Sequence, residues 1–403
     1  MYGLVLEGGG AKGAYHIGAL KALKEMNVKI SAVAGTSIGA MNGAMFVQDK
    51  LDEAYEYWYN ISTSRVLDID DKYLNQLLNF SINQDNISYF VNKAKEVLQN
   101  RGLDDSYLKN IIRENVDEDK LRNSDIDFAI VTLSISDLKP LELFIEDIPK
   151  GKVIEYILAS AYVPAFKMQR IDGKIMVDGG FYDNLPIKTL LNKGYKNIIA
   201  VRTYGLGEIE KKENGDTEII YINPSENLGR MLNFDQKNAR KNIKMGYYDT
   251  MRHFKSLLGR KYYISSPQDK KYFVDFLLNI EKEKIISILK KFSLNQENWQ
   301  RSFLEKFIPR LANLLEIGQK GSYEDILIAL LEKLAEKVEI NRFKIYTFEE
   351  LQKKVIKDYK KEETSLREKL PEFFQTSSLL PKQLREDLVI NIAEDIFLNR
   401  KND

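Results

Sequence analysis

Val33-Ala34-Gly35-Thr36-Ser37-Ile38-Gly39-Ala40 is the stretch on which the interpretation of this 403-residue chain rests. It begins as a short apolar strand, turns at a glycine and a serine, and continues as a helix. The G-x-S-x-G pattern is typical of a nucleophile elbow, in which Gly35 and Gly39 let strand and helix pass close together. Such a turn holds the Ser37 hydroxyl at the amino end of the helix, where the helix dipole favours negative charge. A tight structural turn that needs two glycines explains the same residues, so the context must decide.

Composition limits the classes of protein that the chain can belong to. Hydrophobic residues make up 44% and charged residues 30%, which is ordinary for a soluble globular protein of one or two domains. The net charge of +1 gives no overall attraction to nucleic acid. The absence of cysteine excludes disulfides and thiol catalysis, and two histidines argue against a multi-histidine metal site. We expect no metal, no cofactor and no nucleic-acid partner.

The start of the chain and its apolar runs bear on location. Met1 is followed almost directly by a predicted strand, which leaves no room for a signal peptide. No run of about 18 apolar residues is present to span a membrane. We therefore expect a soluble protein in the cytoplasm.

A glycine loop lies one strand and one helix before the elbow. Tyr2 to Leu6 is predicted as a buried strand and residues 14–26 as a helix, and between them lies Gly8-Gly9-Gly10-Ala11-Lys12-Gly13. G-x-G-x-x-G also occurs in dinucleotide-binding folds, but there the second strand ends in an acidic residue, and here it ends in Gly35-Thr36-Ser37. We favour an oxyanion hole formed by backbone N–H groups at a helix amino end, with a local structural role for Lys12.

A carboxylate follows a later strand. Lys174 to Val177 is predicted as a strand that runs into Asp178-Gly179-Gly180. Alone, this triplet is equally typical of a glycine turn with a capping aspartate. Strands and helices alternate up to about residue 205, which predicts a three-layer α/β/α domain with a mostly parallel central sheet. The insertion at about 68–116 carries no chemical motif, and we interpret it as structural cover.

The three motifs together resemble those of the patatin-like phospholipase family, in the same order and on the same strand-to-turn junctions. The segments Ala159-Ser160-Ala161-Tyr162-Val163-Pro164-Ala165-Phe166 and Asp183-Asn184-Leu185-Pro186 are also similar to bacterial members. The resemblance covers about the first half of the chain. It implies a metal-free acyl hydrolase of lipid esters, with Ser37 as nucleophile, Asp178 as base, Gly8 to Gly13 as oxyanion loop, and Gly179 and Gly180 as the turn that supports the dyad.

The chemistry of these residues agrees with that implication. A serine hydroxyl needs a neighbouring base, and partial burial would raise the pKa of Asp178 above its ordinary value of about 4. A Ser–His–Asp triad is the alternative, because His253 follows Asp178 in the order of α/β-hydrolases. His253 lies on a predicted basic helix, and His16 on the helix after the glycine loop, where surface or packing roles explain them. We predict that replacing either histidine leaves esterase activity, whereas Ser37→Ala and Asp178→Ala abolish it.

The second half of the chain has a different composition. We predict a catalytic domain at 1–205, a connecting strand and basic amphipathic helix at 206–265, and a helical region at 266–403. The helix at 234–258 is a candidate for peripheral membrane contact, although packing on the catalytic domain with solvated charges explains it better. The C-terminal helices are candidates for homo-oligomerisation, a lid or partner binding.

Two classes of function remain open from the sequence. The first is a serine hydrolase of phospholipid or lysophospholipid esters, with a small-ester or acyl-thioester hydrolase as the nearest alternative. The second is a lipid-binding or interaction protein of low turnover on the same fold.

Overall fold

The structure is a computed structural model, and it describes residues 1–62, 66, 106–134, 139–161, 170–171, 173–178, 183–205, 216–267, 269, 271–318, 321–359 and 382–398. The chain divides into two compact units, Met1–His253 and Phe254–Asp403. The part of the predicted insertion up to residue 105, and the predicted turn residues Gly179 and Gly180, lie outside the described residues.

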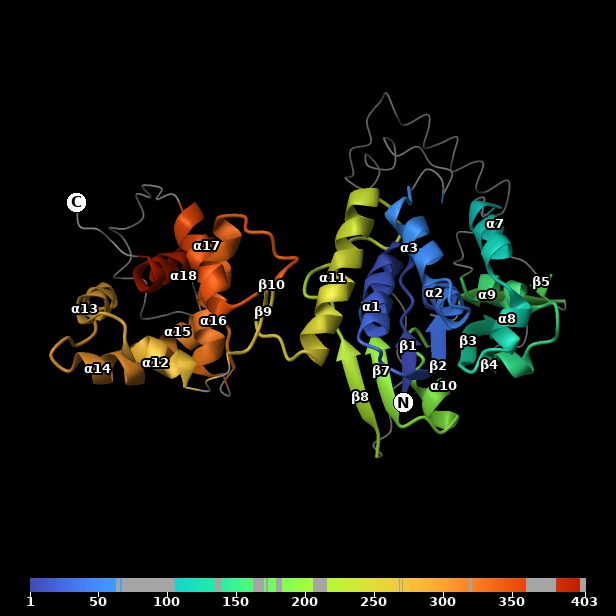
Figure 1. The fold of residues 1–403 in the computed structure, drawn as a ribbon, viewed down its shortest axis with the longest axis horizontal. Coiled ribbons are helices and arrows are strands. Elements are labelled where there is room, and N and C mark those ends of the chain that lie inside the picture. The colour runs from blue at the N-terminus through green and yellow to red at the C-terminus, as the bar shows by residue number, and fades with distance from the viewer. Residues whose placement is uncertain are drawn as a thin grey trace, which may run out of the picture. The chain divides into compact units, whose positions relative to one another are not determined.

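The first unit is built on an eight-stranded sheet (Figure 1). Its hydrogen-bonded order is β5-β6-β3-β2-β1-β7-β8, and the eighth strand, β4, pairs with β3 outside this path. Strands β1, β2, β3, β7 and β8 are parallel, and β4, β5 and β6 run antiparallel to their neighbours. The strands are β1 (Tyr2–Leu6), β2 (Ile30–Thr36), β3 (Asp127–Ser134), β4 (Lys139–Phe144), β5 (Arg170–Ile171), β6 (Lys174–Asp178), β7 (Asn197–Val201) and β8 (Glu218–Ile222). The predicted mostly parallel sheet is confirmed.

Helices cover both faces of this sheet. On one face α2 packs on β2 and α9 on β3, and on the other α10 packs on β2. Alternate strand residues form the core beneath α10, among them Val5, Ala34 and Ile198, with Leu190 of the helix itself. The first-unit helices are α1 (Ala14–Glu25), α2 (Ile38–Val47), α3 (Leu51–Tyr59), α7 (Ser106–Asn115), α8 (Glu118–Arg122), α9 (Val153–Ser160), α10 (Ile187–Asn192) and α11 (Gln236–Phe254), with short 3₁₀ turns at Gly10–Gly13 and Ile145–Asp147.

Helix α11 packs directly on α1 (Figure 1). A Cβ on Gly18 would collide with the backbone oxygen of Ile243, and one on Gly246 with that of Tyr15. The two glycines therefore allow the helix backbones to touch. Because β8 joins the central sheet and α11 packs on α1, the first unit extends past residue 205 to His253.

The second unit is mainly helical around one apolar core. Its helices are α12 (Tyr272–Leu278), α13 (Lys282–Lys291), α14 (Trp299–Ser302), a π-helical turn (Phe303–Phe307), α15 (Ile308–Leu314), α16 (Tyr323–Lys337), α17 (Phe348–Asp358) and α18 (Lys382–Phe397), and its strands β9 (Tyr263–Ile264) and β10 (Ile345–Tyr346) pair in parallel. Ser322 is the N-cap of α16, since its hydroxyl accepts the N–H of Asp325. Buried Glu332 accepts three consecutive backbone N–H groups at residues 260–262 and so ties α16 to the segment before β9.

Candidate active site

The predicted elbow lies where β2 ends and α2 begins. Ser37 has φ 55° and ψ −125°, a backbone conformation that non-glycine residues rarely adopt and that costs about 1–3 kcal/mol. A Cβ on Gly39 would collide with the backbone oxygen of Leu6 in β1, and one on Gly35 with the backbone of Gly39. Both glycines are therefore needed for the helix to pass so close to the sheet, and the strained residue between them is the serine.

Ser160 at the end of α9 supports the strained turn. Its hydroxyl accepts the backbone N–H of Ser37 at 2.8 Å and donates to the backbone oxygen of Val131 at 2.6 Å. Ser160 is fully buried, so the hydroxyl satisfies two buried backbone groups that water does not reach. Ser160 lies in the segment that resembles bacterial family members, but its role was not predicted from the sequence.

The register of β3 brings Ser37 and Asp178 together. On β3, Val131 pairs with Thr36 of β2, and the next residue, Thr132, pairs with Asp178 of β6. Strand β4 pairs with Ala129 to Ser134 of β3, which include residues that pair with β2 and all those that pair with β6. A strand has only two edges, so β2 and β6 must share the edge opposite β4. They approach from opposite directions and meet end to end. At this junction the chain leaves the sheet at Ser37, the residue after Thr36. Both Ser37 and Asp178 are buried.

The glycine loop adjoins the same point. A Cβ on Gly8 would lie 3.4 Å from Cβ of Ser37. Three of the loop amides donate within the protein: Gly8 to the oxygen of Asn184, Ala11 to that of Met231 and Lys12 to that of Gly9. In the described part of the chain, no partner is recorded for the N–H groups of Gly9 and Gly10.

The base of the loop is held by an ion pair that sequence reasoning missed. The buried Glu7 carboxylate accepts the guanidinium of Arg202 at 2.9 Å and the backbone N–H groups of Thr203 and Tyr204 at 2.6 and 3.0 Å. The Thr203 hydroxyl then donates to the oxygen of Gly8 at 2.6 Å. An acidic residue ending an apolar strand was the only signal. These bonds fix the direction in which the loop leaves β1.

Lys12 has the local role that was expected. Its ammonium donates to the backbone oxygen of Tyr204 at 2.6 Å. Partial burial lowers the pKa of Lys12 and outweighs the negative charge of Glu7, which raises it. Lys12 thus joins the loop to the end of β7.

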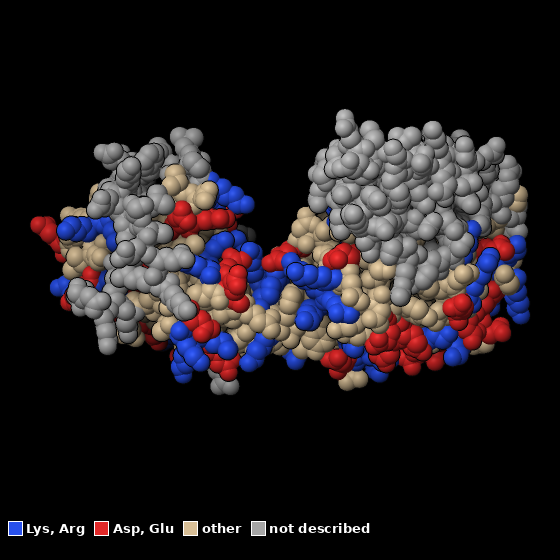
Figure 2. Space-filling model, turned by 90° about the horizontal axis from the view of Figure 1, so that it is seen from above, with Lys and Arg blue, Asp and Glu red and all other residues tan. Residues whose placement is uncertain are grey.

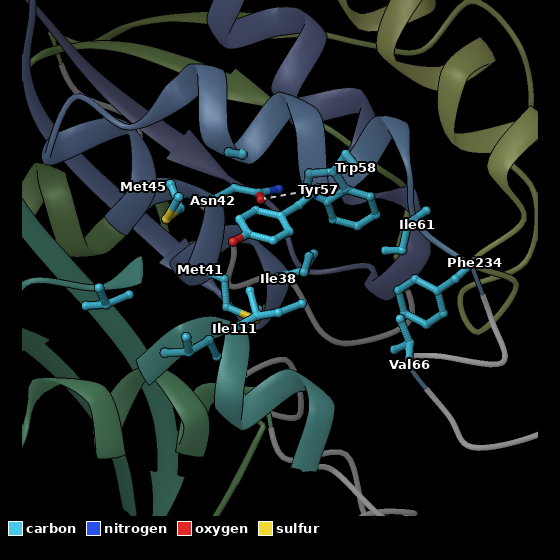
Figure 3. Close-up of a pocket in the computed structure, with 13 residues that line it drawn as sticks. Ile38, Met41, Asn42, Met45, Tyr57, Trp58, Ile61, Val66, Ile111 and Phe234 are labelled. Atoms are coloured by element: carbon cyan, nitrogen blue, oxygen red, sulfur yellow. Dashed lines mark hydrogen bonds between the residues drawn. The ribbon is translucent and has the colours of Figure 1, made fainter. Parts of the chain in front are cut away.

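Asn42 connects the loop, the elbow helix and α3. Its amide donates to the backbone oxygen of Gly13 at 3.0 Å and lies 3.3 Å from Nδ1 of His16, while its oxygen accepts the indole N–H of Trp58 at 2.9 Å (Figure 3). No feature of the motifs had singled out Asn42. Its position one turn into α2 lets one amide join three elements.

Neither histidine is recorded as a partner of Ser37. His16 is fully buried, and this burial lowers its pKa to about 3, so the ring is neutral at ordinary pH. Its Nε2 has no hydrogen-bond partner among the described residues. His253 is exposed at the end of α11.

An apolar pocket begins beside the elbow. Ile38, Met41, Asn42 and Met45 form its wall along α2. Residues of α3 and α7, residues just after these two helices, Val66 and Phe234 supply the rest. Figure 3 shows Ile38 and Met41 between Met45 at one end and Val66 and Phe234 at the other. A Cβ on Gly13 would lie 2.6 Å from Ile38 and 2.9 Å from Trp58. The glycine loop therefore packs against Ile38 and Trp58, two residues that also line the pocket.

Charge on the protein surface is mixed. Figure 2 shows acidic and basic side chains near each other on the visible face. Three of the cations on α11 already have partners within the first unit: Arg240 donates to the oxygen of Tyr59, Lys241 pairs with Glu226 and Arg252 pairs with Asp249. Among the described helices, none is long and apolar enough to cross a membrane.

The fold and the site define an α/β protein with a serine elbow next to a glycine loop. Residues 4–191 match the family model described as patatin-like phospholipase. The patatin-like phospholipase domain-containing protein 6 of Mus musculus is 28% identical over 225 residues, which cover 53% of this chain and 14% of that protein. Lysophospholipase NTE1 of Mycosarcoma maydis is 24% identical over 216 residues, which cover 53% of this chain and 10% of that protein.

Through residues 4–191 this chain is similar to the patatin-like phospholipase family. It spans only 14% and 10% of the length of these two relatives. Among solved structures, VipD from Legionella pneumophila aligns over 100% of this chain and 92% of its own with a TM-score of 0.39 and 15% identity. A likeness at that level carries no argument about function.

Proposed function

We propose that this chain is a serine acyl hydrolase that cleaves carboxylic esters of lipids, with Ser37 as nucleophile and Asp178 as base. The observation that carries the proposal is the meeting of β2 and β6 on one edge of β3, with Thr36 and Asp178 opposite consecutive residues. The strained, buried Ser37 turn adds support, because such strain persists where the surrounding structure enforces it for function. Relatives named phospholipase and lysophospholipase support the same reaction class.

In this mechanism the Ser37 hydroxyl attacks the carbonyl carbon of the ester and passes its proton to the Asp178 carboxylate. The tetrahedral oxyanion accepts hydrogen bonds from the N–H groups of Gly9 and Gly10, the loop amides without a recorded partner in the described chain. Each such donor is typically worth about 3–4 kcal/mol of barrier. Asp178 returns the proton to the departing alcohol, which leaves an acyl-serine. Water then attacks the acyl carbon and passes a proton to Asp178. As the bond to Ser37 breaks, Asp178 returns this proton to the Ser37 oxygen, and the free acid leaves.

The pocket beside the elbow favours a lipid over a short ester. Its lining is apolar apart from Asn42 and Tyr57. The Asn42 amide is bonded to Gly13 and Trp58, and the Tyr57 hydroxyl exchanges hydrogen bonds with Asn115 at 3.0 and 3.3 Å. Since both polar groups are satisfied within the protein, a bound group gains most by being apolar along its whole length.

Labelling with a fluorophosphonate probe tests this proposal. We expect Ser37 to be labelled in the wild type, no label in Ser37→Ala, and a loss of at least a hundredfold in ester hydrolysis for Asp178→Asn, on the scale of about 10²–10⁴ for general-base catalysis. Ser31→Ala, a change at a partly buried serine of β2, is the matched control and should keep full labelling. Persistent labelling of Ser37→Ala, or a wild type that is neither labelled nor active on any ester, would refute the proposal.

Contact of α11 with an anionic membrane has weaker support, because several of its cations are paired within the first unit. Flotation with neutral and anionic liposomes tests it, and equal binding to both rejects an electrostatic contact. A cytoplasmic location and homo-oligomerisation through the C-terminal helices stay predictions.

A further inference from the structure

The pocket beside the elbow has a direction as well as an apolar character. Ile38, Met41, Asn42 and Met45 line it and follow Ser37 at spacings that place them on one face of α2. This face leads away from the proposed nucleophile along the helix axis. An acyl chain attached to Ser37 would therefore lie along α2 if it enters this part of the pocket.

The far end of this face is Met45. It lies eight residues after Ser37, so the path along the helix axis is about 12 Å at about 1.5 Å per residue. Met45 is buried, and so are Ile112 and Val116, which also line the pocket. Figure 3 shows Met45 at one end of the labelled residues. A long, unbranched side chain at this end can close the pocket while adapting to its contents.

We propose that the stretch of α2 from Ser37 to Met45 sets the acyl-chain length of the substrate, with Met45 as the specificity-determining residue at its end. An extended chain advances by about 1.3 Å per carbon, the projection of a C–C bond of about 1.5 Å. The path of about 12 Å along α2 therefore holds about nine carbons. Octanoyl and decanoyl esters are the substrates that fit. This inference rests on the proposed function.

The pocket extends in a second direction, which provides the competing route. Val66 and Phe234 lie at the other end of the labelled residues (Figure 3), and the ring of Phe234 stacks on Trp58 with centroids 6.4 Å apart. The exposed fraction of the Phe234 side chain is 9%, so this end is also lined by a buried ring. A chain that took this route would be limited by Phe234 instead.

A series of p-nitrophenyl esters from butyrate to palmitate, assayed with the full chain, tests the proposal through kcat/KM. The wild type should prefer octanoate and decanoate. Met45→Ala removes three heavy atoms from the end of the pocket and should raise the dodecanoate-to-octanoate ratio by up to about sixtyfold, because each additional buried methylene is worth about fourfold and the vacated space corresponds to three of them. Met45→Phe fills the same end and should lower the decanoate-to-butyrate ratio. The two variants act in opposite directions, so a loss of folding in one leaves the other as a test.

Met251→Ala is the matched control. Met251 is as buried as Met45, at 7% and 8% exposed, but lies on α11 away from the pocket lining. It should leave the chain-length profile of the wild type unchanged. A shift in Phe234→Ala with none in the Met45 variants, or a wild-type preference that rises up to palmitate, would overturn the proposal. Failure of the proposed function is a different result, since no ester of any length would then be cleaved.

Discussion

Ser160→Ala would remove one hydroxyl and leave two buried backbone groups without a partner. The N–H of Ser37 would lose its acceptor at 2.8 Å, and the oxygen of Val131 its donor at 2.6 Å. Each buried group left unsatisfied costs about 1–3 kcal/mol. The expected fall in the free energy of unfolding of the first unit is therefore about 3 kcal/mol, since the two costs share one site.

The same change should lower activity more than binding. Ser160 holds the strained backbone of Ser37, and a displacement of about 1 Å in a reacting group can cost about a hundredfold in rate. We expect kcat to fall by at least tenfold with little change in KM.

Urea unfolding of the full chain measures the stability change. Each unit holds one tryptophan, Trp58 and Trp299, so fluorescence in a Trp299→Phe background follows the first unit alone. Ser31→Ala is the control, because the buried Ser31 hydroxyl has no hydrogen-bond partner among the described residues, so its loss should not lower the free energy of unfolding. If Ser160→Ala is as stable and as active as the Ser31 control, Ser160 does not support the elbow.

Two further predictions concern the surroundings of the site. Burial lowers the pKa of His16 to about 3 from the ordinary 6.5, so as the pH falls from 6.5 towards 3 only the unfolded chain binds this proton, and stability should drop by about 1.4 kcal/mol per pH unit. His16→Gln should flatten this part of a urea-unfolding series between pH 7 and about 4, and an unchanged slope would show that His16 is not its source. Gly39→Ala should abolish folding or activity, because its Cβ would collide with backbone of Leu6, whereas the Cβ of Gly43→Ala meets side chains at 3.0 and 3.2 Å. Soluble expression and fluorophosphonate labelling compare the two, and an active, stable Gly39→Ala would contradict the packing argument.

The elements of the first unit were largely predictable because their signals are local. Apolar runs mark the strands, and β1 has the predicted bounds Tyr2–Leu6. Helix ends were less certain: the predicted helix at 234–258 ends earlier, at Phe254, and Ser256 just beyond it has φ 49°. A positive φ at a non-glycine residue is imposed by the fold and leaves no mark in the pattern.

The sequence by itself determined where the strained serine turn and the glycine loop must lie. Where one backbone contacts another there is no room for a Cβ, so positions 35 and 39 must be glycine, and the sequence shows this directly. Only the tertiary structure decided that Asp178 meets the elbow, because that follows from two strands sharing one edge of β3. It also decided that Ser160 supports Ser37 and that Asn42 joins the loop to α3. These contacts join residues far apart in the chain, and pairing register over such distances depends on the packing of the whole sheet.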